Sequence, residues 1–475
     1  MHGSLRSPDR DALAVLALGL VAAVGLGLVA ARWPVAAVVA AAAIAIAIAM
    51  FKDLAVAIVV FTVASFAAVL SLGGAATGAK GLGLLLVLVW VATVAVRPRA
   101  GSRDLFGEHR WLAVSGIALV AWSILSVAWA RSPNTALLGA SRYAQDLALF
   151  PILYVGVRRF KHVRWIAAAF VAGALLATLY GVATGGTEDS SRLVGALGDS
   201  NETAAVLVPA AVLAFALGVG GRPGVRRWAA VGASVLLLVG LGATASRGGL
   251  VALGVTGVAM IAVAGRWRRQ AALAAIAGLV LVAGWFALLA PASAVEHIST
   301  TQTPRTTLWT VAGRAIETNP IVGLGTDNFQ SDAKNFLIAP GVTTRADQIL
   351  TDPQPAHNMY LEIWADLGIV GLVLFAGVVL AALRAALSAA ARLQAAGRRG
   401  DEFLARALVL AIVAMLAAEF FISDQYSKQL WLLLATAPAM LAAASAGRSA
   451  DPLRAADARV SGYGRHVTAT RGGAR

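Results

Sequence analysis

Long apolar segments alternate with short polar ones along almost the whole chain. An apolar run of about 20 residues is long enough to cross the hydrocarbon core of a membrane as a helix. We predict such helices over 12–31, 34–51, 54–73, 81–96, 111–130, 138–157, 165–183, 203–220, 228–245, 249–265, 271–290, 358–383, 403–423 and 429–446. The pattern therefore indicates an all-α, polytopic membrane protein with about 12–14 transmembrane helices.

Basic residues are distributed unevenly between the two sides of this predicted arrangement. If the N-terminus is cytoplasmic, cytoplasmic segments carry 27 of the 39 Lys and Arg residues and outer segments carry 11. Such a bias is typical of cytoplasmic loops. We predict one transmembrane domain over 1–446 with both termini cytoplasmic, a large extracytoplasmic loop at 291–357, a cytoplasmic loop at 384–402, and a basic, disordered cytoplasmic tail at 447–475.

Composition narrows the classes of function. Only 13% of the residues are charged, against about 25% in a typical soluble domain. The net charge of +15 comes from short loops, where basic residues set orientation and face anionic lipid, so no nucleic-acid partner is predicted. Cysteine is absent, which excludes disulfides and thiolate chemistry. The sequence has no P-loop and, on the outer side, no HExxH motif or DxD pair, so we predict no metal and no other cofactor.

Three segments share the predicted outer face: 184–202, 245–249 and 291–357. Arg247 lies in the second, between two apolar runs and directly before two glycines. Glycine lets a ligand approach the backbone closely, and arginine can bind a phosphate with two parallel hydrogen bonds. Arg247 is therefore a candidate phosphate ligand; the alternative is an arginine that simply snorkels to the membrane boundary.

The long outer loop contains a predicted amphipathic helix at 304–316, which we expect to lie at the membrane surface. Its apolar stripe consists of Leu308, Trp309, Ala312 and Ile316. Arg305 lies in its first turn, where the helix dipole does not favour a cation. Arg305 is either a ligand for an anion or a solvated surface residue.

The loop ends at His357, at the mouth of a predicted membrane helix. Glu362 and Asp366 follow four residues apart, so they share one face of that helix. Carboxylates that enter a membrane helix are costly and usually functional. Histidine suits general-base chemistry near neutral pH, and a helix cap is the alternative role.

Taken in order, these motifs resemble the O-antigen ligase and O-antigen polymerase family. The resemblance covers about residues 185–380, and each motif in it is short. It rests on Gly195-Ala196-Leu197-Gly198-Asp199-Ser200-Asn201, Ser246-Arg247-Gly248-Gly249, Arg305 with Trp309, Asn319-Pro320, Gly323-Leu324-Gly325 with Phe329, and His357-Asn358 with Tyr360-Leu361-Glu362 and Gly368.

The resemblance implies a function at the outer face of a bacterial inner membrane. Family members transfer a glycan from an undecaprenyl-pyrophosphate carrier to a glycan, lipid or protein acceptor. By this resemblance Arg247 and Arg305 bind the pyrophosphate and His357 activates the acceptor hydroxyl, in a metal-independent, inverting reaction. Four further residues are candidates for substrate binding: Arg192, Asn201, Asn358 and Glu362. For Arg192 and Asn201 the alternative role is to order the loop.

Two questions stay open at this stage. Ligase, polymerase and protein-glycosylating members share the motifs, so the acceptor is not determined. A transporter or flippase for lipid-linked glycan or a small anion is the alternative function, and it needs charged residues at mid-depth in the membrane. Here Asp146 and Glu419 are the main charges within predicted spans, and the other polar residues gather outside.

Overall fold

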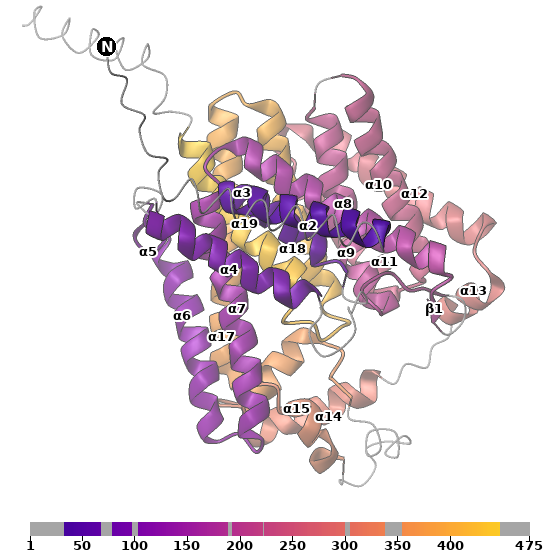
Figure 1. Ribbon diagram of the computed structural model, residues 1–475. Helices are drawn as coiled ribbons and strands as arrows, with labels where there is room; N and C mark the ends of the chain where they lie inside the picture. The colour runs from indigo at the N-terminus through magenta and orange to yellow at the C-terminus, as the bar shows by residue number, and fades with distance from the viewer. Residues whose placement is uncertain are drawn as a thin grey trace, which may run out of the picture.

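The computed structural model describes residues 33–67, 78–96, 103–188, 192–221, 223–299, 305–337 and 354–446. In this part of the chain a helix occupies every predicted apolar run after the first. The predicted helix at 12–31 and the predicted tail at 447–475 lie outside the described residues. The helices are α2 (Pro34–Lys52), α3 (Leu54–Ala64), α4 (Gly78–Val96), α6 (Arg110–Leu125), α7 (Pro133–Gly156), α8 (Phe160–Thr184), α9 (Ser200–Val219), α10 (Val225–Thr244), α11 (Arg247–Val263), α12 (Arg268–Leu288), α17 (Met359–Ala395), α18 (Arg399–Ala418) and α19 (Lys428–Ala446) (Figure 1).

The structure is that of an all-α, multi-pass membrane protein. Six described helical segments are long and apolar enough to cross a membrane: Arg110–Ala128, Phe160–Thr184, Ser200–Val219, Val225–Thr244, Gly265–Leu288 and Met359–Ala395. Four shorter apolar helical segments lie within α2, α3, α4 and α11. The loop that we predicted at 384–402 is corrected, because α17 continues to Ala395 and α18 begins at Arg399. Alanine and arginine are strong helix formers, so the helix continues beyond its apolar part.

Short elements connect the long helices at both ends of the bundle, and those within 184–202 and 291–357 build the region predicted to lie outside. They are α5 (Leu105–Glu108), the 3-10 helices η2 (Ser126–Ala128), η4 (Gly265–Trp267) and η5 (Ala333–Phe336), the antiparallel strands β1 (Thr187–Glu188) and β2 (Arg192–Leu193), α13 (Ala292–Ser299), α14 (Arg305–Thr318) and α15 (Phe329–Asp332).

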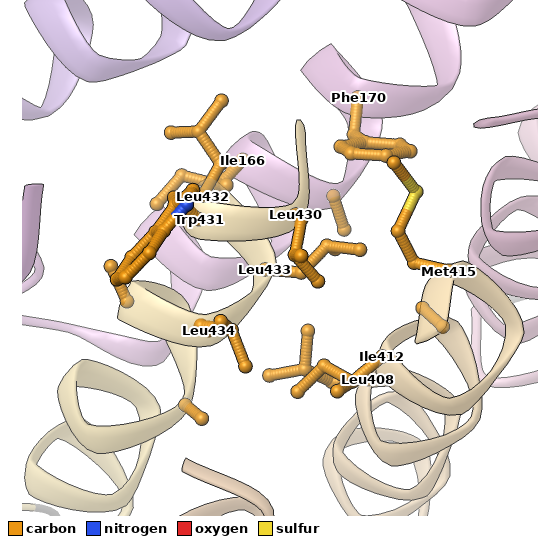
Figure 2. Packing of buried hydrophobic residues seen from close by; sticks show 14 of the residues in the cluster. Ile166, Phe170, Leu408, Ile412, Met415, Leu430, Trp431, Leu432, Leu433 and Leu434 are labelled. Carbon is orange, nitrogen blue, oxygen red and sulfur yellow. The ribbon is translucent and has the colours of Figure 1, made fainter. Parts of the chain in front are cut away.

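The core forms where α9 and α19 are enclosed by other helices. Alanines cover α9, which packs against α8, α10, α11 and α18. Small residues let helix backbones approach closely, which favours helix association within a membrane. Larger side chains fill the space beside α19: Figure 2 shows Phe170 of α8 beside Met415 of α18, with Leu433 of α19 facing them.

The helix α14 is amphipathic as predicted, but its apolar stripe packs against protein instead of facing the membrane surface. Leu308 and Ala312 are buried together with Phe329 and Ala365 in a second apolar cluster. Trp309 is half-buried and contacts Phe420, with 5.6 Å between ring centroids. The cluster fixes α14 to α17, so Arg305 at the start of α14 is held in place.

The loop that follows α14 packs against α17 at a break in that helix. Gly368 adopts φ 68° within α17, and Gly323 and Gly325 in the loop also have positive φ. The backbone N–H groups of Leu324 and Gly325 donate to the carbonyls of Ala365 and Asp366. The Asp366 carboxylate accepts from the N–H groups of Asp327 and Phe329. These motif glycines therefore permit close backbone contact, and Asp366 has a structural role.

Gly368→Ala is expected to destabilise the protein strongly. A Cβ at this position would lie 2.0 Å from the carbonyl oxygen of Ile321, and the positive φ would strain any non-glycine residue. The backbone strain alone costs on the order of 1–3 kcal/mol. Thermal unfolding of the purified protein in detergent measures the effect. The control is Gly313→Ala in α14, where an added Cβ meets nothing within 4 Å; equal melting temperatures of the two variants would contradict this account.

Cysteine labelling tests the predicted orientation. The chain has no cysteine, so a single introduced thiol gives a clean signal. We expect an impermeant reagent to label Thr318→Cys in intact cells and to label Ala395→Cys only after the membrane is opened, because of the 27-to-11 bias in basic residues. Both positions are solvent-exposed in the structure. The reverse labelling pattern would show that the orientation is wrong.

Candidate active site

Four helices begin close to one another at the candidate site: α9, α11, α14 and α17. The three segments predicted to share the outer face meet here through side-chain hydrogen bonds. Arg192 of β2 donates to the carbonyl of Thr244 at 3.0 Å, Ser246 donates to Asn201 at 2.9 Å, and Arg247 donates to the carbonyl of His297. The N-terminal end of a helix carries a partial positive charge, so this convergence favours a bound anion. Figure 1 shows α11, α13 and β1 on one side of the molecule.

Arg247 is the first residue of α11 and is half-buried. The preceding Ser246 caps the helix by accepting from the N–H of Gly249. The two glycines after Arg247 have a packing role: a Cβ on Gly248 would lie 2.8 Å from Phe421, and one on Gly249 would lie 2.8 Å from Ala204. The glycines therefore let neighbouring helices pack against the start of α11, which fixes the position of Arg247.

Arg305 is the first residue of α14 and lies over the ring of Phe421, with 6.0 Å between its guanidinium carbon and the ring centroid. Burial lowers the pKa of Arg305, and the positive charges of Arg192 and Arg247 lower it further. Like charges repel, and an anion bound among the three arginines would offset this repulsion. The cluster therefore favours anion binding.

Arg192 and Asn201 form the layer behind these residues. Arg192 is buried, with 7% of its surface exposed, and donates to the Asn201 side-chain oxygen at 3.0 Å. The same oxygen accepts from Ser246, the neighbour of Arg247. Asn201 thus links the hairpin to the start of α11, and its contacts in the structure are to protein groups.

His357 is half-buried and has a left-handed backbone with φ 48°. A non-glycine residue in this region is uncommon and costs on the order of 1–3 kcal/mol unless its surroundings hold it. Burial lowers the pKa of His357 and the nearby Arg305 lowers it further, while Asp199 raises it. The net direction is downward, so the imidazole is neutral near pH 7 and can accept a proton.

Asn358 and Glu362 hold the backbone on either side of His357. Asn358 caps α17 by accepting from the N–H groups of Tyr360 and Leu361. Glu362 is buried, and its carboxylate accepts from the N–H of Ala356 at 2.8 Å. We predicted both residues to bind substrate, and this stays a prediction; the hydrogen bonds of both residues in the structure position His357. The helix cap considered for His357 is thus provided by Asn358.

The connection between α18 and α19 completes the site, and the sequence reasoning did not include it. Met359 donates its N–H to the carbonyls of Glu419 and Ile422, and Ser423 accepts from the N–H of Asn358 at 3.2 Å. Phe421 packs between Gly248 and Arg305. The aromatic pair at the outer end of the predicted run 403–423 was the one sequence signal that could have pointed to this segment.

A cavity of about 480 Å³ lies beside the site, between α3, α4, α7 and the start of α9. Glu202, Asp424 and Lys428 line its polar part, and apolar residues of α3, α4 and α7 line the rest. Leu84, in its wall, is 64% exposed on the outside of the helix bundle. The cavity wall therefore continues onto the apolar surface that faces lipid in a membrane protein. Within the described part of the chain, no three His, Asp or Glu residues are grouped to hold a metal ion.

Comparison with known families supports the family that the sequence motifs indicated. Residues 232–376 match the model of the O-antigen ligase family. The matched segment contains Arg247, Arg305 and His357 and confirms the family that the motifs indicated. No curated protein matches the chain. The chain therefore carries an O-antigen ligase domain within a multi-pass membrane protein, which assigns it to the handling of lipid-linked glycan in surface polysaccharide synthesis.

Proposed function

We propose that this protein transfers or polymerises a glycan from an undecaprenyl-pyrophosphate carrier onto an acceptor hydroxyl at the outer face of a bacterial inner membrane. The observation that supports it most is the grouping of Arg247 and Arg305, at converging helix N-termini, with Arg192 of β2 and with His357. The donor's pyrophosphate carries at least two negative charges, which three arginines and the helix ends can balance.

In the proposed reaction, His357 accepts the proton of the acceptor hydroxyl. The hydroxyl oxygen then forms a bond to the anomeric carbon of the donor sugar, and the bond from that carbon to the pyrophosphate oxygen breaks. The electron pair leaves with the pyrophosphate, where Arg247 and Arg305 stabilise the developing charge. One displacement at the anomeric carbon inverts its configuration, and the arginines take the part that a metal ion plays in other transferases.

The cavity beside the site offers a path for the carrier lipid. A polyprenyl donor enters from the bilayer, so it needs an opening between helices toward lipid. The apolar walls from α3, α4 and α7 and the exposed Leu84 have this character, while Glu202 and Lys428 provide hydroxyl-binding groups for a sugar.

A transporter is the alternative function, and the placement of charges argues against it. Asp146 lies fully buried within α7, but it forms an ion pair with Lys428 at 2.5 Å. Glu419 lies at the C-terminal end of α18, where its carbonyl holds the start of α17. Paired or helix-end charges do not form the polar mid-membrane path that transport needs.

Glycan transfer by the purified protein tests the proposal. The assay uses a lipid-pyrophosphate-linked donor in detergent, an acceptor glycan, and parallel reactions with and without EDTA. We expect equal activity in both reactions, since the arginines provide the charge stabilisation. We also expect the product to have inverted anomeric configuration, since the reaction is a single displacement. Loss of activity in EDTA would contradict the metal-free mechanism. Absence of accumulated lipid-linked glycan in a deletion strain would contradict the function itself.

The pH dependence of transfer reports the state of His357. Its pKa lies below the ordinary value of 6.5, so its basic form persists below that pH and is lost as pH falls through the lowered pKa. We expect the acidic limb of kcat/KM to have its midpoint below pH 6.5. Asp199→Asn keeps a side chain that can cap α9 but removes a charge that raises this pKa, so it should move the midpoint to lower pH. A midpoint above 6.5, or one that does not respond to this substitution, would exclude His357 as the base.

A further inference from the structure

A second cavity, of about 450 Å³, lies at the opposite end of the helix bundle from the candidate site. It is located where α2, α4 and α7 end and where α3 and α8 begin. Helix α8 has 25 residues and is therefore about 37 Å long. It begins at this cavity and ends at the β-hairpin of the candidate site, so the two sites lie near opposite surfaces of the membrane domain.

Four cations line this cavity: Lys52, Arg158, Arg159 and Lys161. Among the described residues none of them forms an ion pair, although Lys161 lies over the ring of Trp165 at 4.9 Å. The one carboxylate in the lining, Asp53, accepts from the N–H of Ala55 as the cap of α3.

Elsewhere at this end of the bundle, several arginines form ion pairs with acidic residues of the protein. Asp401 pairs with Arg164 and Arg398, and Glu402 pairs with Arg266 and Arg406. The cavity is thus a concave site that holds four cations and one carboxylate, Asp53, and none of the four cations forms an ion pair within the described residues.

The walls of the cavity identify the kind of anion. Phe51 and Val96 are 53% and 79% exposed, and both stand at the ends of apolar helices beside the four cations. A free anion gains nothing from exposed apolar side chains, whereas a phospholipid places its phosphate among the cations and its acyl chains against such residues.

We propose that this cavity binds the phosphate-bearing headgroup of an anionic phospholipid at the membrane face opposite the candidate active site. The ligand is a phosphodiester with attached acyl chains, and the four cations interact electrostatically with its negative charge. The bound lipid would hold the junction of α2 and α3 against the α7–α8 connection. On another side of that connection, Arg103, which precedes α5, donates to the carbonyl of Val157 at 2.9 Å.

Binding of defined lipids to the delipidated, full-length protein tests this proposal. Native mass spectrometry in detergent counts bound short-chain phosphatidylglycerol, with phosphatidylcholine and glycerol phosphate as competing probes. We expect one saturable phosphatidylglycerol site, which neither competitor displaces. The triple substitution Lys52→Gln, Arg159→Gln, Lys161→Gln should weaken binding by about tenfold or more, since each cation near a lipid surface contributes to anion attraction.

A matched triple substitution controls for general charge. Arg226→Gln, Arg268→Gln and Arg269→Gln remove the same charge from the same end of the bundle, at exposed positions outside the cavity. These should leave phosphatidylglycerol affinity within about twofold. Equal weakening by both triples would overturn the proposal in favour of diffuse attraction, and equal binding of glycerol phosphate would overturn it in favour of a free-anion site. Equal melting temperatures of the variants in lipid-free detergent establish that both are folded.

Discussion

His357→Ala is expected to reduce glycan transfer by a factor of roughly 10²–10⁴, the usual contribution of a general base. The substitution removes the group that accepts the acceptor's proton and leaves the charges around the pyrophosphate in place. The loss should appear in kcat, with little change in KM for the lipid donor. It should not unfold the protein, because the neighbouring backbone is held by Asn358, Glu362 and Met359.

His109→Ala provides a matched control for this result. His109 lies at the start of α6, at the other end of the bundle, and packs edge-on against Tyr154. We expect its removal to leave transfer unchanged. Full activity of His357→Ala in the same assay would disprove the proposed mechanism, even though the family match would stand.

Arg247→Ala is expected to reduce transfer by a factor on the order of 10²–10³, because it removes a donor that stabilises the departing pyrophosphate. Arg247→Lys should recover little of this activity. A lysine ammonium is a point charge and cannot reproduce the two parallel hydrogen bonds of a guanidinium. Arg305→Ala should have a loss of the same order, since the two arginines are close enough for their charges to interact.

Arg314→Ala is the matched control for the arginine variants. Arg314 lies on the same helix as Arg305 but is directed toward the carbonyl of Phe336 at 3.4 Å. Steady-state kinetics with the lipid-linked donor measures each variant, and melting temperatures in detergent show whether each is folded. Equal losses for Arg314→Ala and Arg247→Ala would mean that net charge near the site, and not a specific anion contact, controls the reaction.

The sequence predicted the helices well because the signal for a membrane span is local. Each apolar run is long enough to be recognised as a membrane helix from its length and hydrophobicity, and charged residues or glycines mark its ends. The prediction erred at 384–402, where alanine-rich sequence continues the helix although its hydrophobicity has ended. It also placed the apolar stripe of α14 at the membrane surface, because periodicity shows that a face is apolar but not what covers it.

The candidate site was predicted in part. Arg247, Arg305 and His357 were identified by residue type and by order along the chain, and the structure places Arg305 within electrostatic range of both others. Phe421 was not identified, because nothing in the local sequence relates it to Gly248 or Arg305. The substrate-binding role of Glu362 stays a prediction, based on the rule that a carboxylate in a membrane helix is usually functional. Its hydrogen bond from the N–H of Ala356 is visible only in the folded chain.

The sequence by itself thus indicated the class of the protein and the apolar helices, since hydrophobicity belongs to individual residues, and it supplied the candidate site residues, which remain predictions. Only the tertiary structure decided which of these groups meet. The glycines of the Gly323–Gly325 segment and Gly368 proved to be contact points between backbones, and Asn358 and Glu362 proved to hold His357. Such roles depend on contacts between residues far apart in the chain, and these contacts form only when the helices pack.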